Sequence, residues 1–317
     1  MLRYPAAALL LCTLLLAGCS TAKPAWQELP PAPEARTEVV GAALSGRVAV
    51  VGGLTADGRA SARVDLYDPR RERWLRLPDL PEGLHHAMAA SRAGRLYVVG
   101  GYRVRAGEWE ASDRAWVLFD RRWRALPRLP QPRAAGGAAI VRNRIYVVGG
   151  TTARAPGSLA EGSLLLDLRT LRWQGFGGLS RPREHLGVTA LGGRVYAIGG
   201  RTAGLETNTA AADAYDPLSR RWSRLRDPPT RRGGNGATVA GRLAVAVGGE
   251  GPDGTIRPVD AFDPQSGSWR SLPRSPRPRH GVAVVGIGRT LYQGLGGPRP
   301  GLTVSATLQS LRVPTPR

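Results

Sequence analysis

Residues 144–150 read RIYVVGG, a run of β-branched and aromatic residues that ends in two glycines. A run of this kind is typical of a short buried strand that enters a turn. The diglycine recurs in steps of 48, 49, 50, 49 and 48 residues, at Gly52-Gly53, Gly100-Gly101, Gly149-Gly150, Gly199-Gly200, Gly248-Gly249 and Gly296-Gly297. A period in this range indicates stacked or radially arranged copies of one small unit.

Tryptophans keep the same period. They recur in steps of 48, 49, 50, 49 and 47 residues, at Trp26, Trp74, Trp123, Trp173, Trp222 and Trp269. Between each diglycine and the next tryptophan lies a short apolar run that ends in an aspartate, as in residues 64–68. Aspartate, often followed by proline here, is typical of a turn. Each unit therefore predicts four short strands, which in one copy cover residues 136–141, 144–150, 164–167 and 173–176.

These markers resemble the kelch repeat, in which a diglycine closes the second strand, an aromatic residue lies in the third and a tryptophan opens the fourth. The resemblance covers residues 26–313. It implies a β-propeller, whose radial repetition protects the edges of its sheets.

The two ends of the repeat region complement each other. The region begins with a fourth strand at residues 26–29 and ends with a third strand at residues 307–312. Pairing these fragments in one blade would close the ring and leave no exposed blade edge. We therefore expect an all-β protein, a six-bladed propeller of four-stranded kelch blades, with domain limits 26–313 and a C-terminal tail at 314–317.

The first residues have a different character. Arg3 precedes an apolar stretch at residues 6–16, and residues 16–19 read LAGC. This resembles the signal peptide of bacterial lipoproteins, which implies cleavage after residue 18, lipidation of Cys19 and a tether at residues 19–25. It places the protein in the bacterial cell envelope as a membrane-anchored protein. Ser20 favours the periplasmic side of the outer membrane over the inner membrane if the source is Gram-negative.

The formal net charge is +21, and Lys23 is the only lysine among the 45 basic residues. A charge of this size predicts attraction to anionic partners. One set of arginines follows the turn between the first and second strands of every unit: Arg47, Arg95, Arg144, Arg194, Arg242 and Arg289. We expect this set and the tether to lie on one face, against anionic lipid headgroups; the alternative is an evenly basic surface. No specific nucleic-acid partner is expected.

A second set of arginines lies sixteen or seventeen residues before the diglycines, at Arg36, Arg133, Arg183, Arg232 and Arg279, with Leu84 in the remaining unit. We expect these side chains to line the mouth of the central channel as ligand-binding residues. Arginine offers a planar set of donors suited to carboxylate, sulfate or phosphate. The alternative is that they hold the blades together by pairing with backbone or with a neighbouring acid, as arginines of the kelch pattern often do.

Other chemistry falls on the same rim. Trp109 lies in an insertion after the second diglycine, where it could stack on a sugar or pack against its own blade. All four histidines fall here as well, at His85, His86, His185 and His280. We expect no metal site, because zinc needs its nitrogens about 2.0 Å from one point and residues of alternate blades begin far apart. No cofactor is expected.

Three functions remain open. The first is a recognition module for an anionic small molecule, glycan or acidic peptide, such as an acidic sugar or a cell-wall fragment, at an arginine-lined channel mouth. The second is an enzyme, because the chain resembles N-acetylneuraminate epimerase in repeat number and compartment; a mutarotase needs an acid and a base, for which Glu184, His185 and Arg201 are the candidates. The third is a scaffold that docks another envelope protein. The oligomeric state is open.

Overall fold

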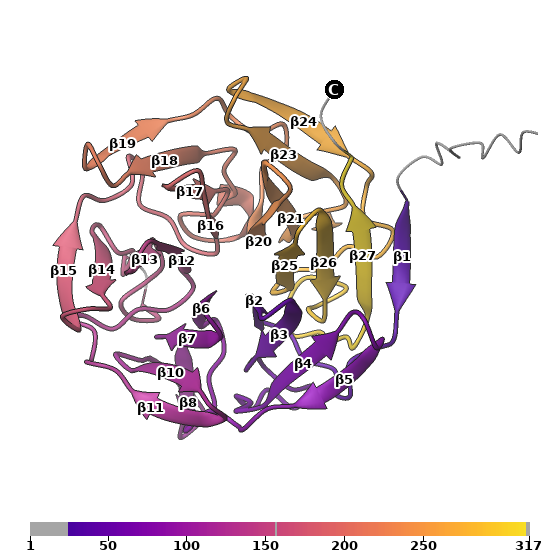
Figure 1. Ribbon diagram of the computed structural model, residues 1–317, viewed down its shortest axis with the longest axis horizontal. Coiled ribbons are helices and arrows are strands. Elements are labelled where there is room, and N and C mark those ends of the chain that lie inside the picture. The colour runs from indigo at the N-terminus through magenta and orange to yellow at the C-terminus, as the bar shows by residue number, and fades with distance from the viewer. Residues whose placement is uncertain (1–24, 156, 315–317) are drawn as a thin grey trace, which may run out of the picture.

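The computed structural model describes residues 25–155 and 157–314, and these residues form six antiparallel blades around a central channel (Figure 1). The prediction of an all-β, six-bladed propeller is confirmed. One short 3₁₀ helix, η1 (Leu205–Thr207), interrupts the strands within the described ranges. In this part of the chain no helix combines the length and apolar character needed to span a bilayer.

Each blade contains four strands that run in order from the channel outward. The first three blades are β2 (Val40–Leu44), β3 (Arg47–Val51), β4 (Val64–Asp68), β5 (Arg73–Arg76); β6 (Met88–Arg92), β7 (Arg95–Val99), β10 (Ala115–Phe119), β11 (Arg122–Ala125); and β12 (Gly137–Val141), β13 (Arg144–Val148), β14 (Ser163–Asp167), β15 (Arg172–Phe176). The next three are β16 (Gly187–Leu191), β17 (Arg194–Ile198), β18 (Ala212–Asp216), β19 (Arg221–Arg224); β20 (Gly233–Ala240), β21 (Leu243–Gly251), β23 (Val259–Asp263), β24 (Ser268–Leu272); and β25 (Ala283–Ile287), β26 (Thr290–Gly294), β27 (Leu308–Arg312), β1 (Trp26–Leu29). The insertions add a hairpin, β8 (Tyr102–Arg105) with β9 (Glu108–Ala111), and a short strand, β22 (Gly254–Thr255).

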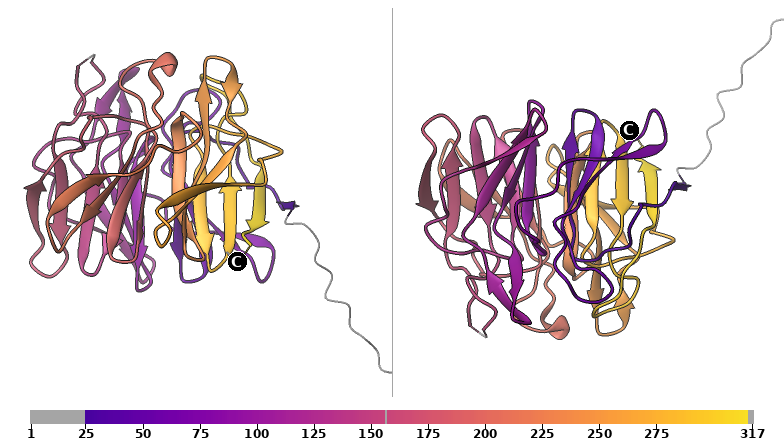
Figure 2. Two further views of the ribbon diagram at one scale, coloured as in Figure 1. Left: turned by 90° about the horizontal axis from the view of Figure 1, so that it is seen from above. Right: turned by 90° about the horizontal axis from the view of Figure 1, so that it is seen from below.

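The ring closes as expected from the sequence. β1 pairs antiparallel with β27, with Trp26 opposite Leu311 and Leu29 opposite Leu308. The indigo β1 therefore lies outside the yellow β27 (Figure 1), at the outer edge of the last blade in both side views (Figure 2). The first described strand thus completes the last blade.

The repeated tryptophans connect neighbouring blades at the periphery. Each indole Nε1 donates a hydrogen bond to a backbone carbonyl of the segment that precedes its blade, as from Trp74 to Pro30 at 2.9 Å and from Trp222 to Gly177 at 2.7 Å. The remaining pairs are Trp26 with Pro273, Trp123 with Pro78, Trp173 with Pro127, and Trp269 with Arg226. The period of tryptophan is therefore the period of this outer contact.

A second contact joins the blades at the channel. One residue per blade adopts a left-handed conformation there, and we call these residues the axial ring: Glu38, His86, Ala135, His185, Gly234 and Gly281, with φ between 52° and 71°. From His86 onward, each N–H donates to the carbonyl of the preceding member, at 2.6–3.0 Å, and at the seam the N–H of Val39 donates to Gly281 at 3.1 Å. Backbone hydrogen bonds thus run around the whole mouth of the channel.

The diglycines also connect blades. The N–H of Gly53 donates to the carbonyl of Leu84 in the next blade at 2.8 Å, with φ of +100°. A Cβ on Gly53 would lie 2.5 Å from the carbonyl oxygen of Thr37, so no larger residue can take this place. In the last blade Leu295 and Gly296 have the positive φ values and Gly296 makes the equivalent bond to Arg36, so this turn is shifted by one residue from the Gly296-Gly297 pair.

The second arginine set is not at the channel mouth, and we correct that expectation. Arg36, Arg133, Arg183, Arg232 and Arg279 are 0–8% exposed. The first four donate to the carbonyl of the first diglycine residue of their own blade. Arg36, Arg183 and Arg232 also pair with third-strand aspartates, as from Arg183 to Asp213 at 2.8 Å. These side chains enter the blades because buried aspartates and carbonyls there need donors.

The pairing varies between blades. In the second blade an apolar pair, Leu84 and Trp116, stands where other blades have arginine and aspartate. In the third blade Arg133 donates to the carbonyls of Gly149 and Gly162 and has no carboxylate partner among the described residues. Burial lowers the pKa of Arg133 to about 10. The fold therefore accepts an ion pair, an unpaired arginine or an apolar pair at this place.

We predict that Arg232→Leu lowers the free energy of unfolding by about 3–5 kcal/mol, because it leaves Asp260 as a buried charge without its partner. Arg232→Leu combined with Asp260→Leu should recover part of this loss. Arg133→Leu is the matched control, because it leaves no carboxylate without a partner, and it should lower the free energy of unfolding by less. Denaturant unfolding measures all three, and equal losses for the two single variants would contradict the explanation.

Candidate functional site

A cavity of about 650 Å³ opens over the mouth of the channel, at the end of the propeller that carries the insertions after the diglycines. Residues from all six blades line it within the described part of the chain. Its floor is the axial ring, from which Glu38, His86 and His185 project side chains, whereas Ala135, Gly234 and Gly281 contribute little beyond backbone. Below the ring the channel narrows to a cavity of about 110 Å³. The floor therefore marks where the channel narrows, and it carries functional side chains from three blades.

One side of the floor is a chain of hydrogen-bonded side chains. Nδ1 of His85 lies 2.6 Å from Nδ1 of His86, and Nε2 of His86 lies 3.1 Å from Oε2 of Glu38. The other oxygen of Glu38 lies 3.1 Å from Nδ1 of His280. Residues from the first, second and sixth blades are thus connected through one carboxylate.

The chain continues around the other side. Nδ1 of His280 lies 3.6 Å from Glu250, whose Oε1 accepts a hydrogen bond from Nη1 of Arg201 at 3.0 Å. Nε of Arg201 donates to Oε1 of Glu184 at 3.3 Å, and the same oxygen lies 3.1 Å from Nδ1 of His185. We call the eight residues from His85 to His185 along this chain the polar belt. From His86 onward, carboxylates alternate in it with basic groups.

The neighbours of His280 determine its charge. Its Nδ1 faces the carboxylates of Glu38 and Glu250, and its Nε2 lies 2.9 Å from the carbonyl oxygen of Arg299. Both ring nitrogens therefore donate, which requires the imidazolium form. Burial alone would lower the pKa of His280, but the hydrogen bond to Glu38 and the two carboxylate charges raise it.

The other members of the belt respond to burial and charge in different ways. Burial lowers the pKa of His85 to about 4 and that of His86 well below its ordinary value, so both rings are neutral at pH 7. Burial opposes ionisation of Glu184, but His185 and Arg201 lower its pKa to about 2. Burial likewise opposes ionisation of Glu38, but His86 and His280 hold its pKa far below the ordinary range. The belt thus combines ionised carboxylates with two neutral imidazoles, His85 and His86, and the imidazolium of His280.

An aromatic wall stands beside this floor. Trp109 of β9 packs against His85, with 4.3 Å between ring centroids, and Tyr102 of β8 bonds to Thr151 at 2.6 Å through its hydroxyl. The guanidinium of Arg154 lies over the Trp109 ring, 3.6 Å from its centroid. Arg154 is exposed and pairs with no carboxylate of residues 25–155 and 157–314.

The structure brings together the candidates Glu184, His185 and Arg201, and it places Trp109 in the wall of the same cavity. The turn arginines lie at the opposite end of the blades, where four of them pair with aspartates that end the third strands: Arg47, Arg144, Arg194 and Arg242. Arg95 lies over the Phe119 ring and Arg289 donates to the carbonyl of Val313. Cys19 lies outside the described residues.

Sequence reasoning missed two features. Arg154 carries no repeat signal, so nothing in the period pointed to it. The expectation that histidines of alternate blades lie too far apart to meet is wrong for His86 and His185, whose ring centroids are 4.9 Å apart. Every axial residue lies fourteen positions before the first residue of the inter-blade turn, from Gly52 to Leu295, so this spacing could have found them.

Comparison with known proteins agrees with this architecture. The family model described as the KLHDC2/KLHL20/DRC7 Kelch-repeats domain matches residues 85–297. The solved structure of YjhT superposes with a TM-score of 0.76 at 17% sequence identity, covering 88% of this chain and 95% of that chain. At this identity the likeness concerns the fold alone. The search of curated proteins finds no match.

We predict that Arg201→Gln raises the pKa of Glu184 from about 2 toward the ordinary value of about 4.3, because the charge and the hydrogen bond that Arg201 supplies are lost. The depressed pKa stabilises the fold above the ordinary carboxyl pKa, and this stabilisation is lost as the pH falls toward 2. Carboxyl-carbon NMR of the metal-free protein measures the pKa, and denaturant unfolding at a series of pH values measures the stability. Arg103→Gln, which removes only the partner of Glu110, is the control; an unchanged Glu184 titration in Arg201→Gln would contradict the assignment.

Proposed function

The chain belongs to the kelch-repeat propellers, and we propose that it is a recognition module that binds an acidic saccharide in the cavity over its channel. One observation supports this most strongly. In the wall of a cavity of about 650 Å³, the guanidinium of Arg154 is stacked on Trp109 and has no carboxylate partner among the described residues.

This arginine suits the anionic end of such a ligand. Stacking on an aromatic ring fixes the plane of a guanidinium and leaves its N–H groups directed outward in that plane. A carboxylate can then accept two parallel hydrogen bonds at a small entropic cost. The proposal thus keeps the anionic ligand expected from the sequence but moves its contact from the buried arginines to Arg154.

The rest of the cavity suits a neutral, hydroxyl-rich ring. In the polar belt three carboxylates, Glu38, Glu184 and Glu250, face the cations of Arg201 and His280. This leaves an excess of negative charge on the floor, which disfavours a small, wholly anionic ligand there. Hydroxyl groups can both donate to the carboxylates and accept from the cations. The volume is in the range of small-ligand cavities.

An enzyme that interconverts sugar anomers or epimers is the second candidate. The observation in its favour is the adjacency of Glu184 and His185, 3.1 Å apart at the cavity floor, with Arg201 on the same carboxylate. A carboxylate and an imidazole beside a sugar ring are the groups that such proton transfers employ. This candidate shares the cavity with the first and differs in requiring turnover.

We predict that Arg154→Gln weakens binding of N-acetylneuraminate by about 10- to 100-fold, the loss expected for a charge-assisted hydrogen bond. Isothermal titration calorimetry measures the affinity. Arg59→Gln, which changes an exposed rim arginine paired with Asp57, is the matched control and should bind like the wild type. N-acetylglucosamine, which lacks the carboxylate, should bind Arg154→Gln and wild type alike.

Equal affinity of Arg154→Gln and wild type for the acidic sugar would contradict the proposed contact. Proton NMR of the anomeric signals separates the two candidate functions in the same samples. Catalysis is favoured if the wild type accelerates anomer exchange and Glu184→Gln abolishes this without loss of affinity. Binding without any acceleration favours the recognition module.

We also propose that the opposite end of the propeller faces an anionic membrane of the bacterial cell envelope, held there by a lipid on Cys19. One observation supports this orientation. Trp26 begins β1 opposite Leu311, which in turn faces Leu291 beside the turn of Arg289, so the chain enters the fold at the end that carries the turn arginines. In the proposed orientation the cavity, at the other end of the blades, would face away from the membrane toward the periplasm.

We predict that replacing Arg95, Arg144, Arg194 and Arg242 by glutamine weakens binding of the unlipidated protein to phosphatidylglycerol-containing vesicles. Each basic residue near such a surface contributes about 1 kcal/mol. Vesicle sedimentation measures the partition. A variant with four substitutions at the cavity end, at Arg59, Arg103, Arg105 and Arg154, carries the same charge change and should bind the vesicles more tightly than the first. Equal losses would contradict the orientation.

A further inference from the structure

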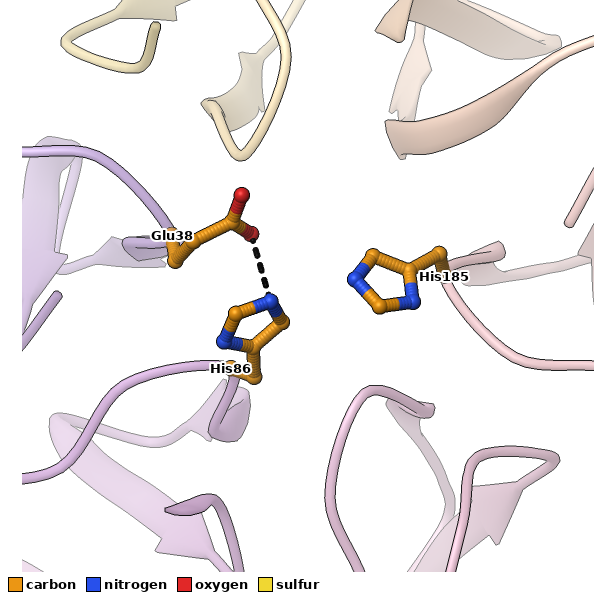
Figure 3. A group of neighbouring side chains, drawn as sticks. All are labelled: Glu38, His86 and His185. Atoms are coloured by element: carbon orange, nitrogen blue, oxygen red, sulfur yellow. Dashed lines mark ion pairs between the residues drawn. The ribbon is translucent and has the colours of Figure 1, made fainter. Parts of the chain in front are cut away.

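Three side chains of the axial ring converge at the cavity floor from three different blades. Glu38, His86 and His185 each offer one ligand atom, and these atoms all lie within 4.8 Å of one another. Figure 3 shows the carboxylate and the two rings directed at a common space. We propose that this group binds a divalent transition-metal ion such as zinc, with its open coordination positions facing the cavity.

The donor set has the chemistry of a catalytic-type metal site. Two imidazole nitrogens and one carboxylate oxygen bind zinc at about 2.0–2.2 Å, and a substrate or water completes the coordination. Tetrahedral ligands at that distance are about 3.4 Å apart. Nε2 of His86 and Oε2 of Glu38 are already 3.1 Å apart, so His185 is the ligand that must approach. Its two neighbours in the axial ring are Ala135 and Gly234, which carry a small side chain and none.

Each proposed ligand is held by a partner on its far atom. Nδ1 of His86 bonds to buried His85 at 2.6 Å, and Oε1 of Glu38 bonds to His280 at 3.1 Å. Nδ1 of His185 lies 3.1 Å from Glu184, which leaves its Nε2 directed at the other two residues (Figure 3). Such outer partners orient metal-binding histidines and carboxylates and fix the histidine tautomer. His86 and Glu38 have a hydrogen-bonded outer partner, and His185 has the carboxylate of Glu184 beside its Nδ1.

Blade closure does not explain why these side chains are present. Glu38, His86 and His185 each have φ of 52°, a conformation that is unfavourable for residues other than glycine. Ala135, Gly234 and Gly281 make the same backbone bonds around the ring without a functional side chain. The three larger residues therefore serve the floor of the cavity, and a shared ligand explains their convergence.

The test uses tag-free protein stripped with a chelator. We expect calorimetry with zinc chloride to give one ion per chain, and cobalt(II) to give the visible absorption bands of a low-coordinate site. His185→Ala and His86→Ala should weaken zinc binding at least 100-fold. His280→Gln, which removes only an outer partner, should weaken it about 10- to 100-fold. Glu161→Gln, an exposed carboxylate outside the cluster, is the control and should bind like the wild type.

Thermal unfolding of each metal-free protein, measured with and without added zinc, separates loss of the metal site from a folding defect. Whatever the unfolding temperature of the metal-free His185→Ala protein, it should lose the increase in Tm that zinc gives the wild type. Absence of stoichiometric zinc binding by the wild type, or unchanged affinity in His185→Ala, would overturn the proposal. Saccharide binding does not enter this assay, so the result stands apart from the proposed function.

Discussion

The backbone hydrogen bonds of the axial ring constrain the rest of the structure. They require one left-handed residue per blade at the channel mouth, and they bring residues nearly fifty positions apart in the chain into contact. Because only the backbone is used, the side chain at each of these positions is free for other roles. In three of the six described blades this position carries a polar side chain, Glu38, His86 or His185, and all three line the cavity.

Arginine serves three distinct purposes in one small protein. Buried arginines neutralise third-strand aspartates inside the blades, turn arginines pair with aspartates at the end opposite the cavity, and Arg201 and Arg154 belong to the cavity itself. A net charge of +21 therefore says little about where a ligand binds. In our proposal the contact is made by Arg154, whose guanidinium has no carboxylate partner among the described residues.

Much of the fold could be predicted from the sequence because the diglycines and tryptophans each make one inter-blade contact per repeat. The same period placed Glu184, His185, Arg201 and Trp109 on one rim, and they share a cavity. The direction of the side chain at Arg183 could not be predicted, because position along a repeat does not say whether a group faces the channel or its own blade. The proximity of His86 to His185 depends on left-handed backbone, which the residue type histidine does not indicate and only the fourteen-residue spacing to the inter-blade turn marks.

The pairing of β1 with β27 joins the first and last strands of the described chain, with Trp26 opposite Leu311. During synthesis the N-terminal strand emerges first and its partner last. At about 5–20 residues per second, the strand waits on the order of tens of seconds before the ring can close. Closure is thus the most non-local step of folding. A strand of only four residues that contains Glu28 offers other chains little to pair with during that delay.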